Sequence, residues 1–225
     1  LLVDFDPQGN ATHGIGAHKV GFDKTVYDIL MRDENVDDVK VTLQMPPLDV
    51  LPSTIDLSGA DVDMAQYETG REQLLKRKLE AVRNQYDYII IDCPPALGLL
   101  NTNALTAADS VMIPVQCEYF ALEGLTQLLS TIRLVQKLWN PRLSIEGVLL
   151  TMFDVRTKLS VEVQQEVRKY FKEKVYHCFI PRNVRLSEAP SREQSIFEYD
   201  TRSEGARAYA QLVKEVVTQN ERIKR

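Results

Sequence analysis

Short runs of apolar residues alternate along this chain with longer segments in which apolar residues recur every three or four positions. The short runs predict buried parallel strands, and they lie at Leu1–Val3, Leu48–Leu51, Tyr88–Ile91, Val111–Val115, Gly147–Met152 and Val175–Ile180. The longer segments predict amphipathic helices at Arg71–Asn84, Leu99–Ala108, Leu122–Trp139, Val161–Lys174 and Gly205–Arg222. Strands that alternate with helices indicate right-handed βαβ crossovers. We therefore predict an α/β fold with a doubly wound, mostly parallel sheet flanked by helices.

The length of the chain suits one domain. Its 225 residues, 44% of them hydrophobic, are enough for one sizeable core, and we predict a single domain over residues 1–225. The chain opens directly on a strand pattern, Leu1–Asp4, with no Met before it. Since a domain rarely begins inside its core sheet, we expect that an N-terminal piece has been cut away. No run of about 20 apolar residues and no leader pattern is visible, so we expect a cytoplasmic protein without membrane attachment.

Charge is distributed unevenly. The net charge is −5, which by itself argues against a nucleic-acid-binding protein. Residues 1–155 contain 12 Lys and Arg against 22 Asp and Glu, a net charge of −10, whereas residues 156–225 contain 15 against 10, a net charge of +5. The second part can therefore present a basic face to phosphate groups, although solvated helix faces would give the same count.

Two acids follow the first predicted strand, in Asp4-Phe5-Asp6-Pro7-Gln8-Gly9. Side chains alternate along a strand, so Asp4 and Asp6 point to the same side at the edge where α/β proteins bind ligands. Pro7 ends the strand and Gly9 permits a tight turn. Aspartates at strand ends also form turns and cap helices, so this pair alone leaves both roles open.

A further acid, Asp92, follows the apolar run Tyr88–Ile91. A strand that delivers one acid to the ligand-binding edge is how a Walker B aspartate is presented, and such a carboxylate helps to hold Mg²⁺ in phosphoryl-transfer sites. Pro94 and Pro95 stiffen the loop that follows, and Gly98 allows a close approach to the backbone. This arrangement suits a loop that senses the terminal phosphate of a nucleotide.

Five segments, in order, resemble the ParA/Soj family of chromosome- and plasmid-partitioning ATPases, in the ParA/MinD superfamily. The stretch Leu1–Thr12 (LLVDFDPQGNAT) is similar to the one that follows the family's deviant Walker A loop. The other four segments are Tyr86–Asn103, Val115–Gly124, Gly147–Arg156 and Ile180–Ser191. The resemblance covers nearly the whole chain and is strongest to the Soj-like chromosomal branch.

The resemblance implies a set of roles. Asp6 would position or polarise the water that attacks the γ-phosphate of ATP, Asp4 would support the metal and the loop, and Asp92 would hold Mg²⁺, through water, as the Walker B acid. Pro94 and Gly98 belong to the nucleotide-sensing loop, and Arg182 and Asn183 would border the nucleotide base. Arg156 and Arg185 match positions implicated in DNA contact, and the planar fork of Arg suits phosphate. A surface ion pair of little energetic value is the alternative for each of these arginines, Arg182 included.

The resemblance also implies partners and a location. Family members form a homodimer with ATP, bind DNA without sequence preference and hydrolyse ATP faster with a ParB-type centromere-binding partner. In bacteria they would lie in the cytoplasm, associated with the nucleoid.

The sequence departs from the family in one respect. The Lys-Gly-Gly-x-Gly-Lys-Thr phosphate-binding loop, its strand and its helix are absent, and in the family they supply the backbone N–H groups and lysines that bind the phosphates. We therefore expect the chain as it stands to lack ATPase activity and to expose unpaired sheet edges. The assignment applies to the intact parent protein.

Other classes of protein remain open. A MinD-like membrane-cycling ATPase shares these acids but would end in a basic amphipathic helix, which the polar residues Gln219–Arg225 disfavour. A metabolic P-loop enzyme is a second alternative, although a nitrogenase iron-protein relative would need cysteines in other contexts. A third is a catalytically silent DNA-binding regulator in which the acids are structural. ATP turnover distinguishes this last class from a partition ATPase.

Overall fold

A computed structural model describes residues 1–44, 47–118 and 121–223, so Tyr119 and Phe120 of the segment Val115–Gly124 and the last two residues of the polar tail lie outside the described residues. The chain divides into two compact units. Unit 1 contains Leu1–Asp109 and Thr131–Leu143, and unit 2 contains Ser110–Ser130 and Ser144–Arg225. The prediction of one domain over residues 1–225 stays a prediction.

Unit 1 has a four-stranded sheet in the order β2-β3-β1-β4. Strand β1 is central and pairs in parallel with β3 and β4, whereas β2 pairs with β3 in the antiparallel direction. The strands are β1 Leu2–Asp4, β2 Val41–Gln44, β3 Pro47–Leu51 and β4 Ile90–Asp92. The α-helices are α1 Asn10–Gly14, α2 Val26–Met31, α3 Val36–Val39, α4 Ala60–Ala65, α5 Leu74–Glu80 and α6 Leu99–Ala107.

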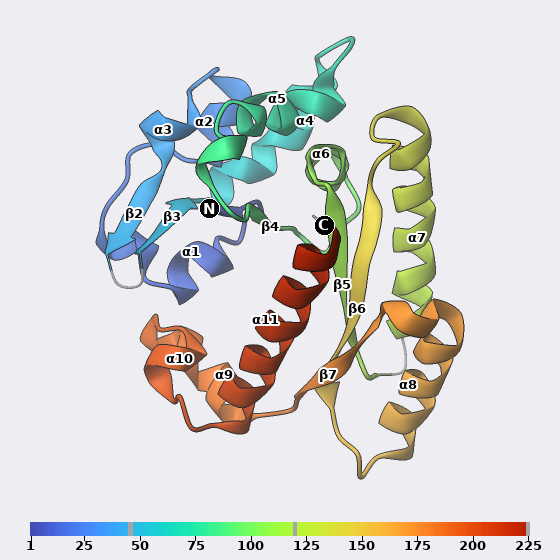
Figure 1. The fold of residues 1–225 in the computed structure, drawn as a ribbon. Helices are drawn as coiled ribbons and strands as arrows, with labels where there is room; N and C mark the ends of the chain where they lie inside the picture. Colours follow the sequence, from blue (N-terminus) through green and yellow to red (C-terminus); the bar gives the residue numbers. More distant parts are fainter. Residues whose placement is uncertain (45–46, 119–120, 224–225) are drawn as a thin grey trace. The chain divides into compact units, whose positions relative to one another are not determined.

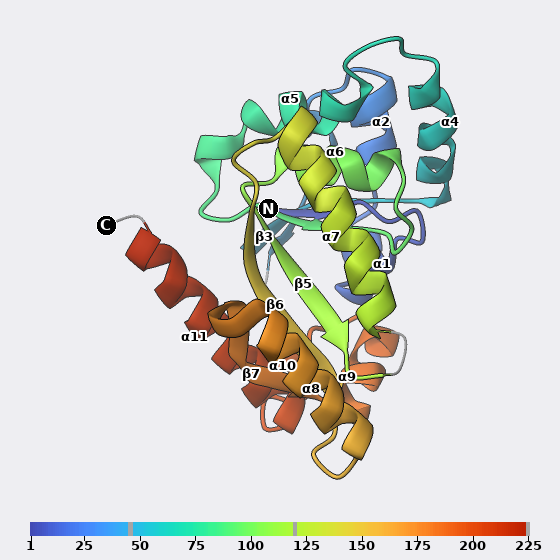
Figure 2. The ribbon, with the colours of Figure 1, turned by 90° about the vertical axis from the view of Figure 1, so that its right-hand side faces the viewer.

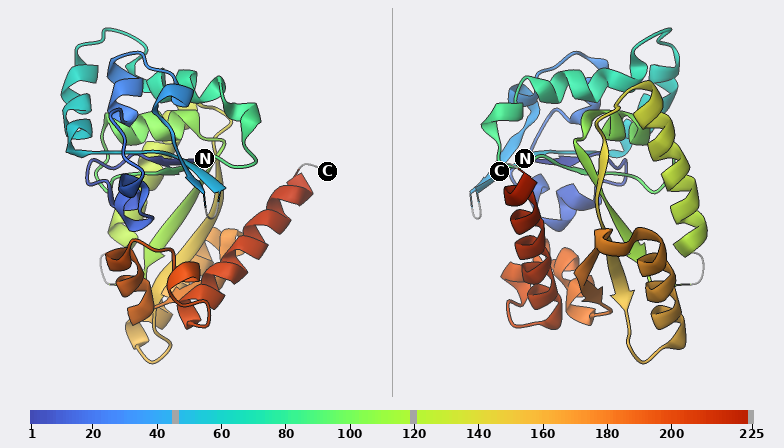
Figure 3. Two further views of the ribbon diagram at one scale, coloured as in Figure 1. Left: turned by 90° about the vertical axis from the view of Figure 1, so that its left-hand side faces the viewer. Right: turned by 45° about the vertical axis from the view of Figure 1, so that its right-hand side comes forward.

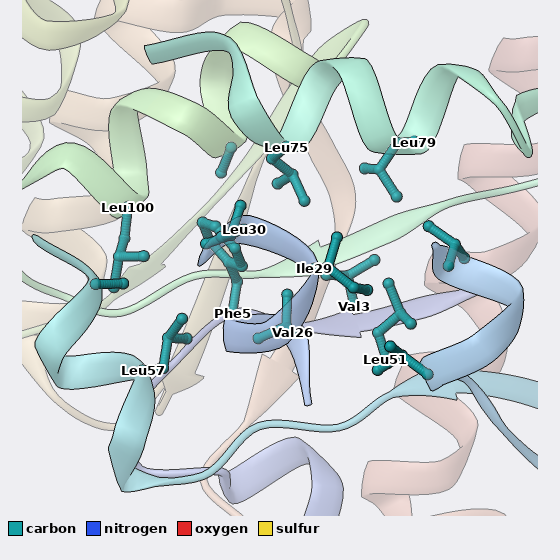
Figure 4. Packing of buried hydrophobic residues seen from close by; sticks show 14 of the residues in the cluster. Val3, Phe5, Val26, Ile29, Leu30, Leu51, Leu57, Leu75, Leu79 and Leu100 are labelled. Carbon is teal, nitrogen blue, oxygen red and sulfur yellow. The ribbon is translucent and has the colours of Figure 1, made fainter. Parts of the chain in front are cut away.

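Helices α2, α5 and α6 bury one face of this sheet. Their apolar residues meet those of β1 and β3 in a cluster, in which Val3 and Phe5 have no exposed surface. Figure 4 shows Ile29 of α2 and Leu75 of α5 pointing into this cluster. Burial of each such side chain stabilises a fold by about 1.5–3 kcal/mol. The core therefore holds β1 in place, and with it the polar residues that follow this strand.

Unit 2 has a parallel three-stranded sheet in the order β5-β6-β7, and Figure 2 shows β5 and β6 running side by side. The strands are β5 Ser110–Gln116, β6 Ser144–Phe153 and β7 Val175–Pro181. The α-helices are α8 Lys158–Phe171, α9 Val184–Glu188, α10 Ile196–Tyr199 and α11 Glu204–Ile223, while α7, Ala121–Leu138, begins in unit 2 and ends in unit 1. Helices α8 and α11 cover opposite faces of this sheet (Figures 1 and 3).

The α/β class with mostly parallel strands flanked by helices is confirmed. The expected single sheet appears in the described residues as two sheets. The expected strand at Tyr88–Ile91 begins only at Ile90, whose side chain is 61% exposed instead of buried. The reason is its position, because β4 stands at the end of the sheet order and pairs only with β1 in the described part of the chain. Over the same residues, no helix is long and apolar enough to span a membrane.

Candidate functional site

Two carboxyl groups lie at the carboxyl ends of β1 and β4. The parallel register places Asp4 opposite Asp92, and the Phe5 N–H donates a hydrogen bond of 2.8 Å to the Asp92 carbonyl oxygen. Asp6 follows two residues after Asp4. Because α/β proteins bind ligands at the carboxyl ends of their parallel strands, we call Asp4, Asp6 and Asp92 the acidic edge of unit 1.

Asp4 is fully buried and its carboxylate is occupied by its own chain. The Thr12 N–H and the Thr12 hydroxyl each donate to Asp4 Oδ2 at 2.7 Å, and the Asp6 N–H lies 3.3 Å from Oδ1. The Thr12 hydroxyl oxygen also accepts the Ser53 N–H at 3.0 Å, next to the end of β3. These contacts suit the support of a loop, and they leave Asp4 no exposed surface for direct contact with a ligand.

Asp6 lies in a tight turn and keeps one carboxylate oxygen available. Its Oδ1 accepts the Gln8 N–H at 3.0 Å, and its carbonyl oxygen accepts the Gly9 N–H at 2.9 Å. Gly9 has φ of +63°, a conformation that favours glycine. In the described chain Asp6 Oδ2 accepts no hydrogen bond and the residue is half-buried. Asp6 can therefore orient a water molecule through Oδ2.

The pKa of Asp92 is raised above its usual value. Loss of hydration is the main cause, and the neighbouring carboxylates of Asp4 and Asp6 add to it. A bound cation would relieve this repulsion. Mg²⁺ prefers oxygen ligands and keeps several waters, so Asp92 fits a magnesium ion held through water. Across the described residues, no group of three or more His, Cys, Asp or Glu side chains could hold a metal ion.

The loop after Asp92 is tied to the first turn of α6. The Asn101 side-chain amide donates to the Pro94 carbonyl oxygen at 2.9 Å and also to the Ala96 carbonyl oxygen. Gly98, the residue before α6, has φ of −124° and ψ of −163°, an extended conformation open to any residue. A Cβ atom built at Gly98 would lie 2.7 Å from Oδ2 of Asp61, a residue of α4.

The carboxyl ends of the strands of unit 2 carry charged residues. Arg182 follows β7, and its guanidinium donates to Glu118 Oε1 at 2.8 Å, just beyond the end of β5. Asn183 caps α9, because its side-chain oxygen accepts the Arg185 N–H at 3.0 Å. Whether Arg182 and Asn183 border a nucleotide base stays a prediction.

Arg156 and Arg185 are exposed and already have acidic partners. Arg156 donates to both carboxylate oxygens of Asp154, at 2.9 and 2.7 Å, and this fork lowers the pKa of Asp154 to about 2. Arg185 pairs with Glu188 at 2.9 Å and Asp200 at 3.6 Å. A phosphate group would have to compete with these carboxylates, although exposed ion pairs contribute only about 0–1 kcal/mol.

The structure thus brings Asp4 and Asp92 side by side in unit 1, with Asp6 two residues after Asp4 and with Pro94 and Gly98 in the loop that follows Asp92. It places Arg156, Arg182, Asn183 and Arg185 in unit 2. Sequence reasoning missed the side chains that hold the loops of unit 1, which are Thr12, Asp61 and Asn101. Thr12 lies in the segment Leu1–Thr12, but only the fold shows what its hydroxyl contacts. No local sequence pattern indicates the role of Asp61, because the residue that it contacts, Leu100, lies 39 residues further along the chain.

The chain is similar to known proteins along most of its length. A family described as an AAA domain matches residues 1–145. The chain is 60% identical over 216 residues to the sporulation initiation inhibitor protein Soj of Bacillus subtilis, covering 96% of this chain and 85% of that protein. It is 48% identical over 220 residues to the chromosome partitioning protein ParA of Caulobacter vibrioides, covering 97% and 82%.

A solved structure with the same fold is a Mycobacterium smegmatis protein described as cobyrinic acid a,c-diamide synthase, crystallised with ADP and magnesium. It superimposes with a TM-score of 0.82 at 34% identity and covers all of this chain and 83% of its own. The identity to this protein is well below the identity to Soj.

Proposed function

Because the chain belongs to the ParA/Soj family of chromosome-partitioning ATPases, we propose that it is the ATP-hydrolysing component of a DNA-partition system. ATP and Mg²⁺ are its cofactors. The observation that carries the proposal is the acidic edge, where Asp4 and Asp92 stand opposite each other on adjacent parallel strands and Asp6 follows with one free carboxylate oxygen. The 60% identity to Soj favours partition over the chemistry of a metabolic enzyme.

The surroundings of the three acids support the roles that we propose for them. Asp6, half-buried and free at Oδ2, orients the attacking water and accepts its proton. Asp4 holds the turn in which Asp6 lies through its bonds to Thr12 and the Asp6 N–H. Asp92 holds Mg²⁺ through water, and the ion, when bound, neutralises charge on the phosphates. The loop with Pro94 and Gly98 responds to the terminal phosphate.

The charged ends of the unit 2 strands suit binding of DNA and of the nucleotide. Arg156 and Arg185 are 85% and 54% exposed, and each presents a guanidinium that can exchange a carboxylate for a DNA phosphate. In this proposal Arg182 and Asn183 border the base, residues 1–225 act as a single nucleotide-binding domain, and two copies associate with ATP. A ParB-type partner accelerates hydrolysis, and the protein is cytoplasmic and associated with the nucleoid.

The test is ATP turnover by the protein expressed from its complete reading frame, measured alone, with nonspecific DNA, and with DNA plus a ParB-type protein. We expect slow turnover that rises most with both additions. The variant Asp6→Ala should bind ATP and lose at least about tenfold in turnover, since a positioned base contributes about 10²–10⁴. Asp23→Ala, which removes an exposed carboxylate outside the acidic edge, serves as the matched control.

Each contrary result points to a different protein. Full turnover by Asp6→Ala removes Asp6 from its role, whereas a wild-type protein that binds DNA without hydrolysing ATP is a silent regulator. Stimulation by anionic vesicles instead of DNA indicates a MinD-like protein.

A further inference from the structure

The first turn of α6 is capped by a residue from a distant part of the chain. The residue before α6 is Gly98, which has no side chain to accept the free N–H groups of the helix. Asp61 of α4 supplies the acceptor, and its Oδ1 receives the Leu100 N–H at 3.2 Å. Its negative charge is also favourable at the N-terminus of a helix. Asp61 therefore caps the N-terminus of α6, although it belongs to α4.

Gly98 leaves the space in which this carboxylate lies. A Cβ atom built at Gly98 would be 2.7 Å from Asp61 Oδ2 and 3.6 Å from its Cγ. The extended backbone at Gly98 accepts any L-residue, so the backbone alone does not demand glycine. Since Asp61 Oδ2 is the end of a rotatable side chain, an added methyl group would push the carboxylate off the Leu100 N–H.

The same turn holds the loop that follows Asp92. Asn101, only 7% exposed, donates to the carbonyl oxygens of Pro94 and Ala96. The Gly98 N–H also donates to the Ala96 carbonyl oxygen, at 3.1 Å. Any shift of the first turn of α6 therefore moves the loop between Cys93 and Gly98, and with it the environment of Asp92.

We propose that Asp61 is a positioning residue for this loop and that Gly98 is small in order to admit the Asp61 carboxylate. The proposal rests on the function proposed above, because the loop matters for turnover only if the acidic edge binds nucleotide. It also replaces the sequence-based reason for Gly98, a close approach of the nucleotide, with one internal to the protein.

The experiment is a double-mutant cycle with Asp61→Ala, Gly98→Ala and the double variant in the protein expressed from its complete reading frame. Each single variant should lower turnover severalfold, leave ATP affinity within about twofold and raise the exchange rate of the Leu100 amide at least about threefold, as expected when a helix cap is removed. The double variant should have the same turnover and the same Leu100 amide exchange rate as Gly98→Ala, because both changes remove the same interaction. Asp61→Asn keeps an acceptor oxygen and should retain most of the protection.

Two results overturn the proposal. Effects of the single variants that multiply in the double variant mean that Gly98 acts independently of Asp61, for example by approaching the nucleotide. Unchanged exchange of the Leu100 amide in Asp61→Ala means that the carboxylate does not cap α6. Exchange of the Leu100 amide is measured without ATP, so it tests the cap whether or not the protein hydrolyses ATP. A wild-type protein that lacks turnover would contradict the proposed function and leave the test of the cap unaffected.

Discussion

The hydroxyl group of Thr12 joins two strand ends within unit 1. It donates to the buried carboxylate of Asp4 at 2.7 Å and accepts the Ser53 N–H at 3.0 Å. In Thr12→Val the shape remains but neither hydrogen bond can form, so the buried Ser53 N–H is left without its acceptor and Asp4 Oδ2 keeps only the bond from the backbone N–H of residue 12. Leaving such a group unsatisfied costs about 1–3 kcal/mol, and we expect a decrease of that size in the free energy of unfolding, measured by urea denaturation.

Turnover separates this effect from a general loss of stability. Thr12→Val should lower ATP turnover at temperatures where the variant remains folded, because Asp4 also receives the Asp6 N–H. Thr12→Ser keeps the hydroxyl and should retain most of the stability and turnover. A valine variant with the stability of the parent would show that the hydroxyl contributes nothing to this loop.

At the level of single residues, the sequence predicted the acids better than their partners. Asp4, Asp6 and Asp92 could be found because apolar runs end directly before them or one residue away. The contacts of Thr12 with Asp4 and of Asp61 with Leu100 span 8 and 39 residues, and no local pattern reports them. The pairing of Arg156 with Asp154, two residues earlier, depends on a turn that the sequence pattern does not define.

Among the elements, α11 closes an irregularity in β7. The register joins Val148 to Val175 and Leu150 to Phe179, so β7 has two extra residues between these pairs. The N–H groups of His177 and Cys178 both point to Glu215 of α11, and each lies 2.9 Å from a carboxylate oxygen. A carboxylate that accepts two backbone N–H groups at an edge strand also keeps other strands from pairing there.

We therefore expect Glu215→Ala to lower the free energy of unfolding by about 1–3 kcal/mol, since hydrogen bonds to charged groups are among the stronger ones. Glu215→Gln keeps one acceptor oxygen and should have an intermediate effect. The control is Lys214→Ala, which changes an exposed residue of the same helix. Equal denaturation midpoints for Glu215→Ala and the control would mean that the carboxylate does not hold α11 to β7.

The elements that sequence analysis located best are those with a strong apolar signal. The five longer helical segments and five of the six apolar runs coincide with helices and strands. Strand β2 was missed because Thr42 and Gln44 interrupt its apolar pattern, as expected for an antiparallel strand at a sheet end. Helices α1, α3, α9 and α10 have only four or five residues, too few to show a helical period.

For the whole molecule, net charge conceals a difference between the units. By sequence, unit 1 contains 12 Lys and Arg against 18 Asp and Glu, a net charge of −6, and unit 2 contains 15 against 14, a net charge of +1. The basic excess of residues 156–225 is therefore largely offset within unit 2. The DNA binding that we propose would then depend on a few exposed arginines rather than on a strong overall field.

We therefore expect Arg156→Glu combined with Arg185→Glu to weaken DNA binding. Each new acid would stand beside an existing one, Asp154 or Glu188. ATP-dependent DNA affinity should fall, and the slope of log K against log salt should become shallower by about 2, roughly one for each arginine that no longer meets a phosphate. ATP binding should persist.

A matched control has the same change in net charge at exposed or half-exposed positions of unit 1, Lys76→Glu with Arg142→Glu. If this control weakens DNA binding as much, the effect reflects overall charge and not the two arginines. Filter binding or fluorescence anisotropy across a salt series measures both variants.

The buried contact of Asp4 with Thr12 also restricts how sequences of this kind can diverge. An amide in place of the acid would set its NH2 group against the N–H of either Thr12 or Asp6, and a valine in place of Thr12 would remove the hydroxyl that bonds both Asp4 and the Ser53 N–H, so either change alone is costly. Evolutionary exchange at the two positions should therefore be correlated, with both polar or both apolar. Asp6, half-buried and bonded only within its own turn, is free of that structural coupling, and chemistry alone would keep it an acid.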